Sequence, residues 1–489
     1  MIDLTTNPAI LSRNIQKARE HGVIIPTFQQ MKHPETIPEK VREKLKEVAL
    51  WDVNPLNLFR ITWKNEPKET GGLFGMPNFI ELPPALTGVP ARILCLVGKW
   101  FPTGCHKVGA SFGCLAPRLV TGQFDASYHR AVWPSTGNYC RGGAFNSKLL
   151  GVQSVAILPA GMSRERFEWL SQIAGEVIAT PGCESNVKEI FDKTWELRRE
   201  PDCMIFNQFE EMGNHPWHYQ VTGSAIAEVF EDIKRPGDRL SGACFTSGSA
   251  GTIGCGDYLK ERHPGLKLAV GEALQCPTIL ENGFGDHRIE GIGDKHIPWI
   301  HNVKNTDMVI DIDDEDSQRL PRLFNDPVGH AYLREAGVDE ETVANLPLLG
   351  ISGIANVLCC IKMCKYYELT DRDVVATVLT DSAVMYGSRI AELEERDGPY
   401  TGRDAAVDHS LHMLGMRTDA MAELSYYDRK RIHNLKYYTW VEQQGRTAAD
   451  LNDLWYDEEK TWRGVQGQAV ELDALINAFN EAAGVLDQL

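Results

Sequence analysis

The chain has 489 residues, 43% of them hydrophobic, so it can bury one large core or two moderate ones. Its 67 acidic and 50 basic residues give a formal net charge of −17, which argues against a nucleic-acid or anionic-membrane partner, because their phosphates would repel the protein. The N-terminal residues lack the pattern of a signal peptide and no stretch approaches the roughly 18 apolar residues of a spanning helix, so the 12 cysteines predict reduced thiols and a cytoplasmic protein.

Both ends of the chain differ from the middle in amino-acid composition and hydrophobic pattern. Residues 1–60 are polar and interrupted by prolines, and PETIPEKVREKLKEVALWD at 34–52 predicts a charged amphipathic helix opened by Pro38. Residues 396–489 are rich in Glu, Asp, Tyr and Trp and have helical periodicity in AVELDALINAFNEAAG. We therefore expect an N-terminal extension, a main domain over residues 61–395 and a mostly helical C-terminal extension.

The main domain alternates short apolar runs with helical patterns. Strands are expected in ARILCLVGKW, RAVWPSTGN, SVAILPA, EVIATPG and CMIFNQF, with helices in RERFEWLSQIAG and NVKEIFDKTWELRRE. Farther on, GACFTSGSAGTIGCGDYLKERHPGLKLAVGEA reads as strand, glycine-rich turn, helix and strand. This order predicts an α/β fold with a largely parallel sheet, in which ligands bind beyond the carboxyl ends of the strands.

The loop Thr246–Gly256, TSGSAGTIGCG, follows a strand and opens a helix. Its glycines let the backbone approach a ligand, and free N–H groups at a helix start attract an anion. A plain strand-to-helix turn is the alternative. The sequence is not a Walker loop, and the glycine spacing is wrong for a dinucleotide fold, although Glu272 stands at about the right distance.

Two further polar loops also follow predicted strands. Ser135, Thr136 and Asn138 in PSTGNYCRGG offer hydroxyls, an amide and backbone donors suited to a carboxylate or a ring oxygen. Asp381 and Ser382 occupy the third loop, LTDSAVMYGS. In isolation, each of these loops is better explained by helix capping than by ligand binding.

A lysine among small residues favours ligand binding over helix capping as the explanation of these loops. Lys107 lies in PTGCHKVGAS, between a cysteine–histidine pair and small side chains that are expected to make room for a ring. An amine that can form a Schiff base, an anion loop, a carboxylate loop and a late serine together indicate pyridoxal phosphate chemistry. Cys359, Cys360 and Cys364 are interpreted as buried thiols on one helix, and no metal site is expected.

Eight segments in order resemble the fold-type II pyridoxal-phosphate enzymes, above all the cysteine synthase and cystathionine β-synthase group within the tryptophan synthase β-like superfamily. The resemblance covers residues 70 to 390. The segments are CHKVGAS, PSTGN, GMSRERFEWLSQIAGEVIATPG, FNQFEEMGNHPWHYQVTGSAIAEVF, TSGSAGTIGCG, IEGIGDKHIP, GISGIANVLCCIKM and VLTDSAVMYGS. The resemblance implies two open, twisted, mainly parallel sheet subdomains with the cofactor between them. The smaller subdomain, over about residues 131–225, would be mobile.

The resemblance also implies roles for individual residues. Lys107 would hold the cofactor as a Schiff base, and Ser382 would meet its pyridine nitrogen. The phosphate would be bound by Gly248, Ser249, Ala250, Gly251 and Thr252, the substrate by Ser135, Thr136, Gly137, Asn138, Tyr139 and Gln208, with Asn138 also near the cofactor ring. Ala250 replaces a glycine of the family, and Tyr139 stands where a small residue is common.

The implied activity is chemistry at the β-carbon of a small β-substituted amino acid through an aminoacrylate, either β-elimination or β-replacement. Alternatives within the fold are an amino-acid dehydratase or ammonia-lyase and an isomerase. A non-catalytic pyridoxal-phosphate-binding subunit is a further alternative, which has no need of Lys107. A nucleotide-binding oxidoreductase rests on the glycine loop alone. A homodimer is the expected assembly.

Overall fold

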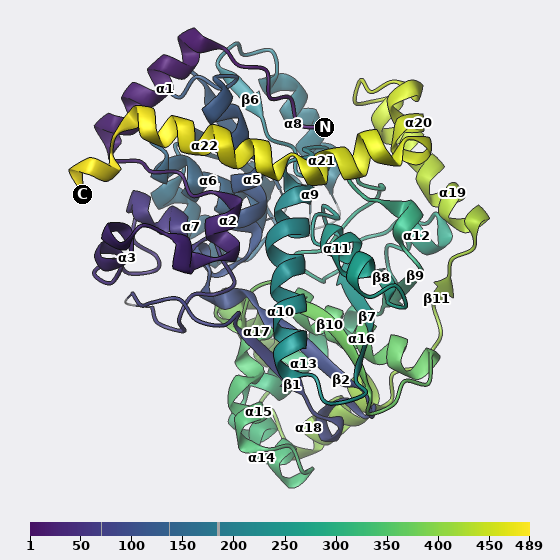
Figure 1. The fold of residues 1–489 in the computed structure, drawn as a ribbon. Helices are drawn as coiled ribbons and strands as arrows, with labels where there is room; N and C mark the ends of the chain where they lie inside the picture. Colours follow the sequence, from purple (N-terminus) through teal and green to yellow (C-terminus); the bar gives the residue numbers. More distant parts are fainter. Residues whose placement is uncertain (70, 136, 183–185) are drawn as a thin grey trace.

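The computed structural model describes residues 1–69, 71–135, 137–182 and 186–489, and the chain folds around two sheets (Figure 1). In the described residues the larger sheet has the order β1-β2-β10-β7-β8-β9-β11. Its strands are β1 (Phe79–Leu82), β2 (Arg92–Val97), β7 (Arg239–Thr246), β8 (Lys267–Ala273), β9 (Met308–Ile312), β10 (Asp373–Leu379) and β11 (Met421–Glu423). The five central strands are parallel, and β1 and β11 close the two edges in antiparallel pairing.

The smaller sheet is parallel throughout and has the order β5-β4-β3-β6. It contains β3 (Arg130–Pro134), β4 (Gln153–Pro159), β5 (Glu176–Thr180) and β6 (Cys203–Ile205), with helices α6 (Asn138–Leu149), α7 (Arg164–Ile173) and α8 (Val187–Leu197) between them. Helix α5 (Lys107–Thr121) leads from β2 of the larger sheet into the smaller one and packs on α6. These two sheets and their parallel strands confirm the predicted fold class.

Helices cover both faces of the larger sheet, which is why its strands are almost continuously apolar. Residues of α10 (Gly223–Ile233) and α11 (Gly254–Arg262) belong to the core on one side, and residues of α13 (Asp314–Asn325) and α16 (Ile351–Tyr366) to the core on the other. The other helices of this region are α12 (Thr278–Glu281), α14 (Pro327–Glu335), α15 (Glu340–Asn345), α17 (Gly387–Asp397) and α18 (Gly402–His409). Alternate residues of β2 enter two different cores: Leu94 and Leu96 join the core that contains α5, and Ile93 and Cys95 join the core that contains α16. The cysteines of α16 are buried, as expected.

The two ends of the chain pack against each other and on α5. Helices α1 (Pro8–His21) and α2 (Phe28–Lys32) contact α22 (Ala469–Ala483), which also contacts α5; Figure 1 shows α22 lying across this part of the molecule. The side chain of Asp473 accepts hydrogen bonds from the backbone N–H groups of Phe28 (2.6 Å) and Gln29 (3.1 Å), and Asn480 accepts one from Ile25 (2.9 Å). The remaining helices of the ends are α3 (Glu39–Leu45), α19 (Tyr426–Lys436), α20 (Ala448–Tyr456) and α21 (Gly464–Gly467).

The helix predicted in residues 34–52 is present but shorter. It begins after Pro38, as expected, and ends at Leu45. The buried guanidinium of Arg60 donates to the carbonyls of Leu45 (2.6 Å) and Val48 (2.5 Å), so the chain satisfies these groups without continuing the helix. A distant side chain of this kind cannot be recognised from helical periodicity.

No helix in the described ranges is both long and apolar enough to cross a membrane. The same part of the chain has no cluster of three or more His, Cys, Asp or Glu side chains that could hold a metal ion.

Replacing Asp473 with alanine is expected to lower the free energy of unfolding by about 1–3 kcal/mol, because the buried N–H group of Phe28 and the partly buried one of Gln29 lose their acceptor. Thermal denaturation would report this loss. Glu481→Ala, an exposed position on the same helix, is the control and should leave the melting temperature unchanged. Equal melting temperatures for both variants would show that the contact between the chain ends contributes nothing to stability.

A second prediction concerns Glu272 and Asp311, which are register partners on β8 and β9. Burial, together with the neighbouring carboxyl of Glu272, raises the pKa of Asp311 to about 9. The folded pair therefore holds a proton that unfolded carboxyl groups release near pH 4, so stability falls as pH rises between those values. Asp311→Asn should make the fall between pH 6 and pH 9 shallower by about 1 kcal/mol per pH unit, measured by urea denaturation. Parallel curves for both proteins would show that folding does not raise the pKa of Asp311.

Candidate active site

Lys107 is the first residue of α5 and is only 8% exposed. Its amine donates a hydrogen bond to the hydroxyl of Ser249 (3.2 Å), in the glycine-rich loop after β7. The small residues that follow the lysine pack against the protein: a Cβ on Gly109 would lie 2.0 Å from the ring of Trp217, and one on Gly113 would lie 2.4 Å from the carbonyl of Gly213. The expectation that these residues make room for a cofactor ring is therefore wrong for Gly109, which like Gly113 allows close packing on α9 (Asn214–Trp217).

The loop from Gly248 to Thr252 is an anion cradle by its donor set. In the described part of the chain, none of the five backbone N–H groups of these residues donates to a protein acceptor. Ala250 takes the left-handed conformation (φ 64°), which a family glycine adopts without strain. Helix α11 begins two residues after Thr252, so the positive end of its dipole faces the same loop.

Asn214 holds this loop from outside. Its side-chain amide donates to the hydroxyl of Ser249 (3.0 Å) and to the carbonyl of Gln208 (3.2 Å). A Cβ on Gly251 would lie 2.1 Å from Oδ1 of Asn214, so position 251 must be glycine for the asparagine to fit. One hydroxyl thus joins the lysine to the start of α9.

A small cavity lies between the lysine and the loop. Its lining includes Lys107, Thr246, Gly248, Ala250, Thr252, Gly291, Asn356 and Thr380. Asn356 of α16 fixes the strand ends around it by accepting from the N–H of Thr246 (2.7 Å) and donating to the carbonyl of Val378 (2.8 Å). An amine beside a row of unused N–H groups is the donor set that a phosphorylated aldehyde requires, so these residues fit pyridoxal phosphate.

The predicted substrate loop follows β3 and precedes α6. The hydroxyl of Ser135 accepts from the N–H of Gly137 (3.0 Å) and from the amide of Gln208 (3.2 Å), so Gln208 does back this loop. Thr136 lies outside the described residues. The amide of Asn138 donates to the carboxylate of Asp381 (2.7 Å), which connects the smaller sheet to the end of β10.

The remaining two predicted site residues are both buried. The ring of Tyr139 packs on Trp133, with ring centroids 5.5 Å apart, and burial raises the pKa of its hydroxyl well above the usual value. Ser382 follows Asp381, and its carbonyl accepts the N–H of Met385 (3.0 Å). The neighbouring Thr380 lines the cavity with Lys107, which places the end of β10 at the site.

The structure also brings in residues that the motifs did not identify. Asp381 does not cap a helix, because its carboxylate accepts from Asn138 and from the hydroxyl of Tyr386 (2.7 Å). Arg166 in turn donates to Tyr386 (3.0 Å) and pairs with Glu290 (2.8 Å). Apart from the bond between Asp381 and Tyr386, these contacts join residues more than 100 positions apart, so local spacing could not have revealed the network.

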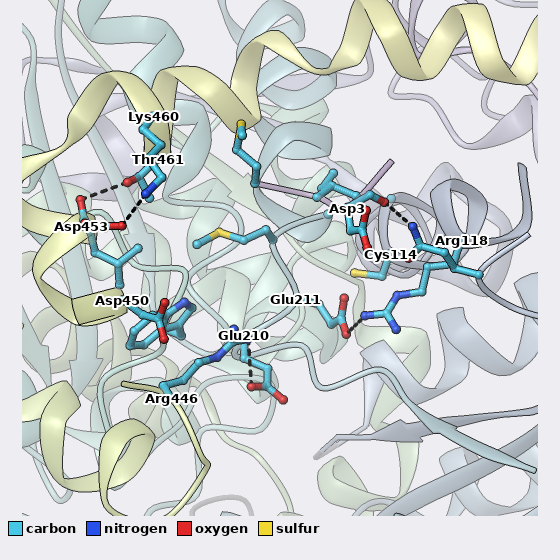
Figure 2. Close-up of a pocket in the computed structure, with 18 residues that line it drawn as sticks. Asp3, Cys114, Arg118, Glu210, Glu211, Arg446, Asp450, Asp453, Lys460 and Thr461 are labelled. Atoms are coloured by element: carbon cyan, nitrogen blue, oxygen red, sulfur yellow. Dashed lines mark hydrogen bonds and ion pairs between the residues drawn. The ribbon is translucent and has the colours of Figure 1, made fainter. Parts of the chain in front are cut away.

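A larger cavity, of about 380 Å³, lies farther along α5, between Cys114 and Arg118 and the C-terminal extension (Figure 2). Its charged side chains pair with one another, as in Arg118 with Glu211 (2.5 Å) and Lys460 with Asp453 (2.7 Å). It contains none of the predicted site residues. The smaller cavity is therefore the candidate active site, because only that one combines the lysine with the anion loop.

The fold and this site define the class of the protein. The family model of pyridoxal-phosphate dependent enzymes matches residues 100–326, which include the lysine, the substrate loop and the phosphate loop. An O-acetyl serine sulfhydrylase (isoform 3) from Entamoeba histolytica has a similar fold, with a TM-score of 0.55 over 69% of this chain and 93% of that one at 21% identity. These findings confirm the resemblance to fold-type II enzymes and the predicted cofactor.

Two curated relatives narrow the comparison. The chain is 32% identical over 193 residues to a probable cysteine synthase of Bacillus subtilis, which covers 39% of this chain and 61% of that protein. It is 26% identical over 324 residues to the cystathionine beta-synthase of Saccharomyces cerevisiae, which covers 64% and 60%. The chain thus spans about three fifths of the length of each of these relatives.

Two neighbouring substitutions test the phosphate loop. Gly251→Ala should weaken pyridoxal phosphate binding by roughly tenfold or more, because its Cβ displaces Asn214 from Ser249. Ala250→Gly should stay within about 1 kcal/mol of the wild-type stability, since relief of the left-handed strain offsets the added freedom of the unfolded chain. Cofactor titration and thermal denaturation would check both, and unchanged affinity in Gly251→Ala would contradict the assigned role of Asn214.

Proposed function

We propose that this chain is a pyridoxal-phosphate enzyme that acts at the β-carbon of a small β-substituted amino acid, by elimination or by replacement. The observation that supports this most directly is the hydrogen bond from the buried amine of Lys107 to the hydroxyl of Ser249. In the described part of the chain, the backbone N–H groups of its loop, Gly248 to Thr252, donate to no protein acceptor. The curated relatives are named cysteine synthase and cystathionine beta-synthase, which favours chemistry at the β-carbon. The particular amino acid and leaving group are a matter for substrate tests.

Pyridoxal phosphate, when bound, supplies an electron sink that makes the α-proton of an attached amino acid acidic. Lys107 would hold the cofactor through its amine and, once released by the substrate, would take the α-proton as general base. The hydroxyl of Ser249 lies 3.2 Å from this amine and orients it. The N–H groups of Gly248 to Thr252 would hold the phosphate.

The α-carboxylate of the substrate would bind at the loop of Ser135, Thr136, Gly137 and Asn138. Gln208 keeps the Ser135 hydroxyl in place, and Asp381 does the same for the amide of Asn138. Ser382 would face the ring nitrogen of the cofactor, and Tyr139 would limit the size of the substrate pocket. Because Asn138 begins α6 beside the smaller sheet and Asp381 follows β10 of the larger sheet, their hydrogen bond would break or form if the smaller sheet moves.

We further propose the division of the chain into residues 1–60, 61–395 and 396–489, with the smaller sheet inside about 131–225 as a moving part. A homodimer is the assembly that we expect. An amino-acid dehydratase, an ammonia-lyase or an isomerase would use the same lysine and loops. A non-catalytic subunit would bind the cofactor without responding to amino acids.

Lys107→Ala is the decisive variant. The wild-type protein loaded with pyridoxal phosphate should have a visible absorbance band that shifts when one member of a panel of β-substituted amino acids is added, and Lys107→Ala should lack the original band. Lys148→Ala, an exposed lysine on α6, is the matched control and should behave as wild type.

Three other results would each change the conclusion. A wild-type protein without the band after loading would refute the cofactor site. A band that no amino acid shifts would favour the non-catalytic subunit. Release of ammonia from an amino acid without a good β-leaving group would favour the dehydratase.

A further inference from the structure

Arg141 is a buried arginine beside the candidate active site to which the proposed chemistry gives no task. It lies on α6, one helical turn after Asn138, and is 2% exposed. Its guanidinium lies 4.7 Å from the ring centre of Trp169 and 5.8 Å from that of Trp51. A hydrogen bond from Nη1 to the sulfur of Met385 (3.2 Å) is its strongest polar contact in the described residues.

No carboxylate of the described chain forms an ion pair with this guanidinium, and its buried Nε has no hydrogen-bond partner there. The contrast with Arg166, one helix later, is direct: Arg166 is equally buried but bonds Glu290 and Tyr386. Buried guanidinium groups are normally paired, because removal of a charge from water is costly. A thioether is a weak acceptor and two indole faces compensate only in part.

The surroundings of Arg141 belong to the site. Trp51 and Met385, which both contact the guanidinium, also lie against Gly104, three residues before Lys107: a Cβ on Gly104 would be 3.0 Å from Trp51 and 3.9 Å from the Met385 sulfur. Met385 follows the Asp381–Ser382 loop. Burial and the nearby charge of Arg166 lower the pKa of Arg141 to about 10. The neighbouring groups of Cys105 and Asp381 raise it in part, which shows that both lie near the guanidinium. The guanidinium therefore stands between the lysine turn and the end of β10.

The acidic side chains at this end of the site already have other partners. Glu290 pairs with both Arg166 and Arg389, Glu392 also pairs with Arg389, and the carboxylate of Asp381 accepts from Asn138 and Tyr386. The loop that would take the α-carboxylate consists of neutral donors. An amino acid with a single carboxylate would thus leave Arg141 without an anion, whereas a reactant with a second acidic group would pair it.

We propose that Arg141 is a specificity-determining residue that binds a second anionic group, a carboxylate or phosphate carried by the reacting molecules in addition to the α-carboxylate. This inference rests on the proposed function. The planar fork of arginine forms two parallel hydrogen bonds to such a group, and Trp51 and Trp169 hold it in one orientation. The anion is carried either by the leaving group of the amino acid or by the nucleophile that replaces it.

Two experimental arms separate these sources. In the elimination arm, O-succinyl-L-serine is compared with the uncharged O-pentanoyl-L-serine of similar length, and release of pyruvate gives kcat/KM. In the replacement arm, O-acetyl-L-serine is the donor, and mercaptoacetate is compared with 2-mercaptoethanol as nucleophile. The charged member of at least one pair is expected to have a kcat/KM roughly 10- to 100-fold higher, mainly through a lower KM.

Arg141→Leu should reduce this ratio to about one, and Arg141→Lys should recover part of it, because lysine keeps the charge but not the fork. Arg164→Met on α7 is the matched control: its guanidinium is exposed and pairs only at the surface with Glu168 among the described residues, so the ratio should stay at the wild-type value. A ratio that survives in Arg141→Leu would overturn the inference.

Wild-type measurements decide the matter if the Arg141 variants do not fold. Loaded wild-type protein should bind a dicarboxylate such as succinate more tightly than the monocarboxylate butyrate, measured by the shift of the cofactor band or by calorimetry. Equal binding, together with no preference in either arm, would overturn the inference but leave the proposed function intact. A protein that never acquires the cofactor band would refute the proposed function, and this inference with it.

Discussion

The arrangement of the candidate site depends on one hydroxyl group. Ser249 accepts hydrogen bonds from the amine of Lys107 and from the amide of Asn214, so the start of α5, the phosphate loop and the start of α9 meet at a single atom. Each of these elements is held separately elsewhere: α5 against α9 by glycines, the loop by β7 and α11, and α9 by its continuation into α10. The lysine is therefore positioned by three rigid elements, which a reacting group needs in order to keep its geometry.

The second connection across the site is of a different kind. Asn138 and Asp381 join the smaller sheet to the larger one through a side-chain bond, and Asp381 is held by Tyr386 and, through it, by Arg166 and Glu290. This network is buried and polar, so its geometry is narrowly defined when every member is paired. The lysine end of the site is thus held by close packing of helices, whereas the end near Asn138 and Asp381 is held by hydrogen bonds between side chains.

The sequence predicted the elements of this site better than their contacts. The loops after β3, β7 and β10 were recognisable because glycine, serine and asparagine follow apolar runs, and the alternation of strand and helix patterns indicated a largely parallel sheet. Asp381 was interpreted as a helix cap, since its partner Asn138 lies 243 residues earlier. The small residues near Lys107 were read as space for a ligand, although Trp217 fills that space. Spacing along the chain carries no information on such distant partners, and Arg141 differs from an ordinary paired arginine only in what surrounds it.

The contacts of Asp473 have a consequence for the order in which the molecule is assembled. A ribosome releases α1 and α2 before α22, and the bond between Phe28 and Asp473 spans 445 positions. Until α22 emerges, the face of α5 that it covers is exposed to water, although every residue of the candidate site has already been synthesised. The entropy cost of closing a loop grows only slowly with its length, but this contact cannot form until α22 has been synthesised. Docking of α22 is therefore the step that covers this face of the helix of Lys107.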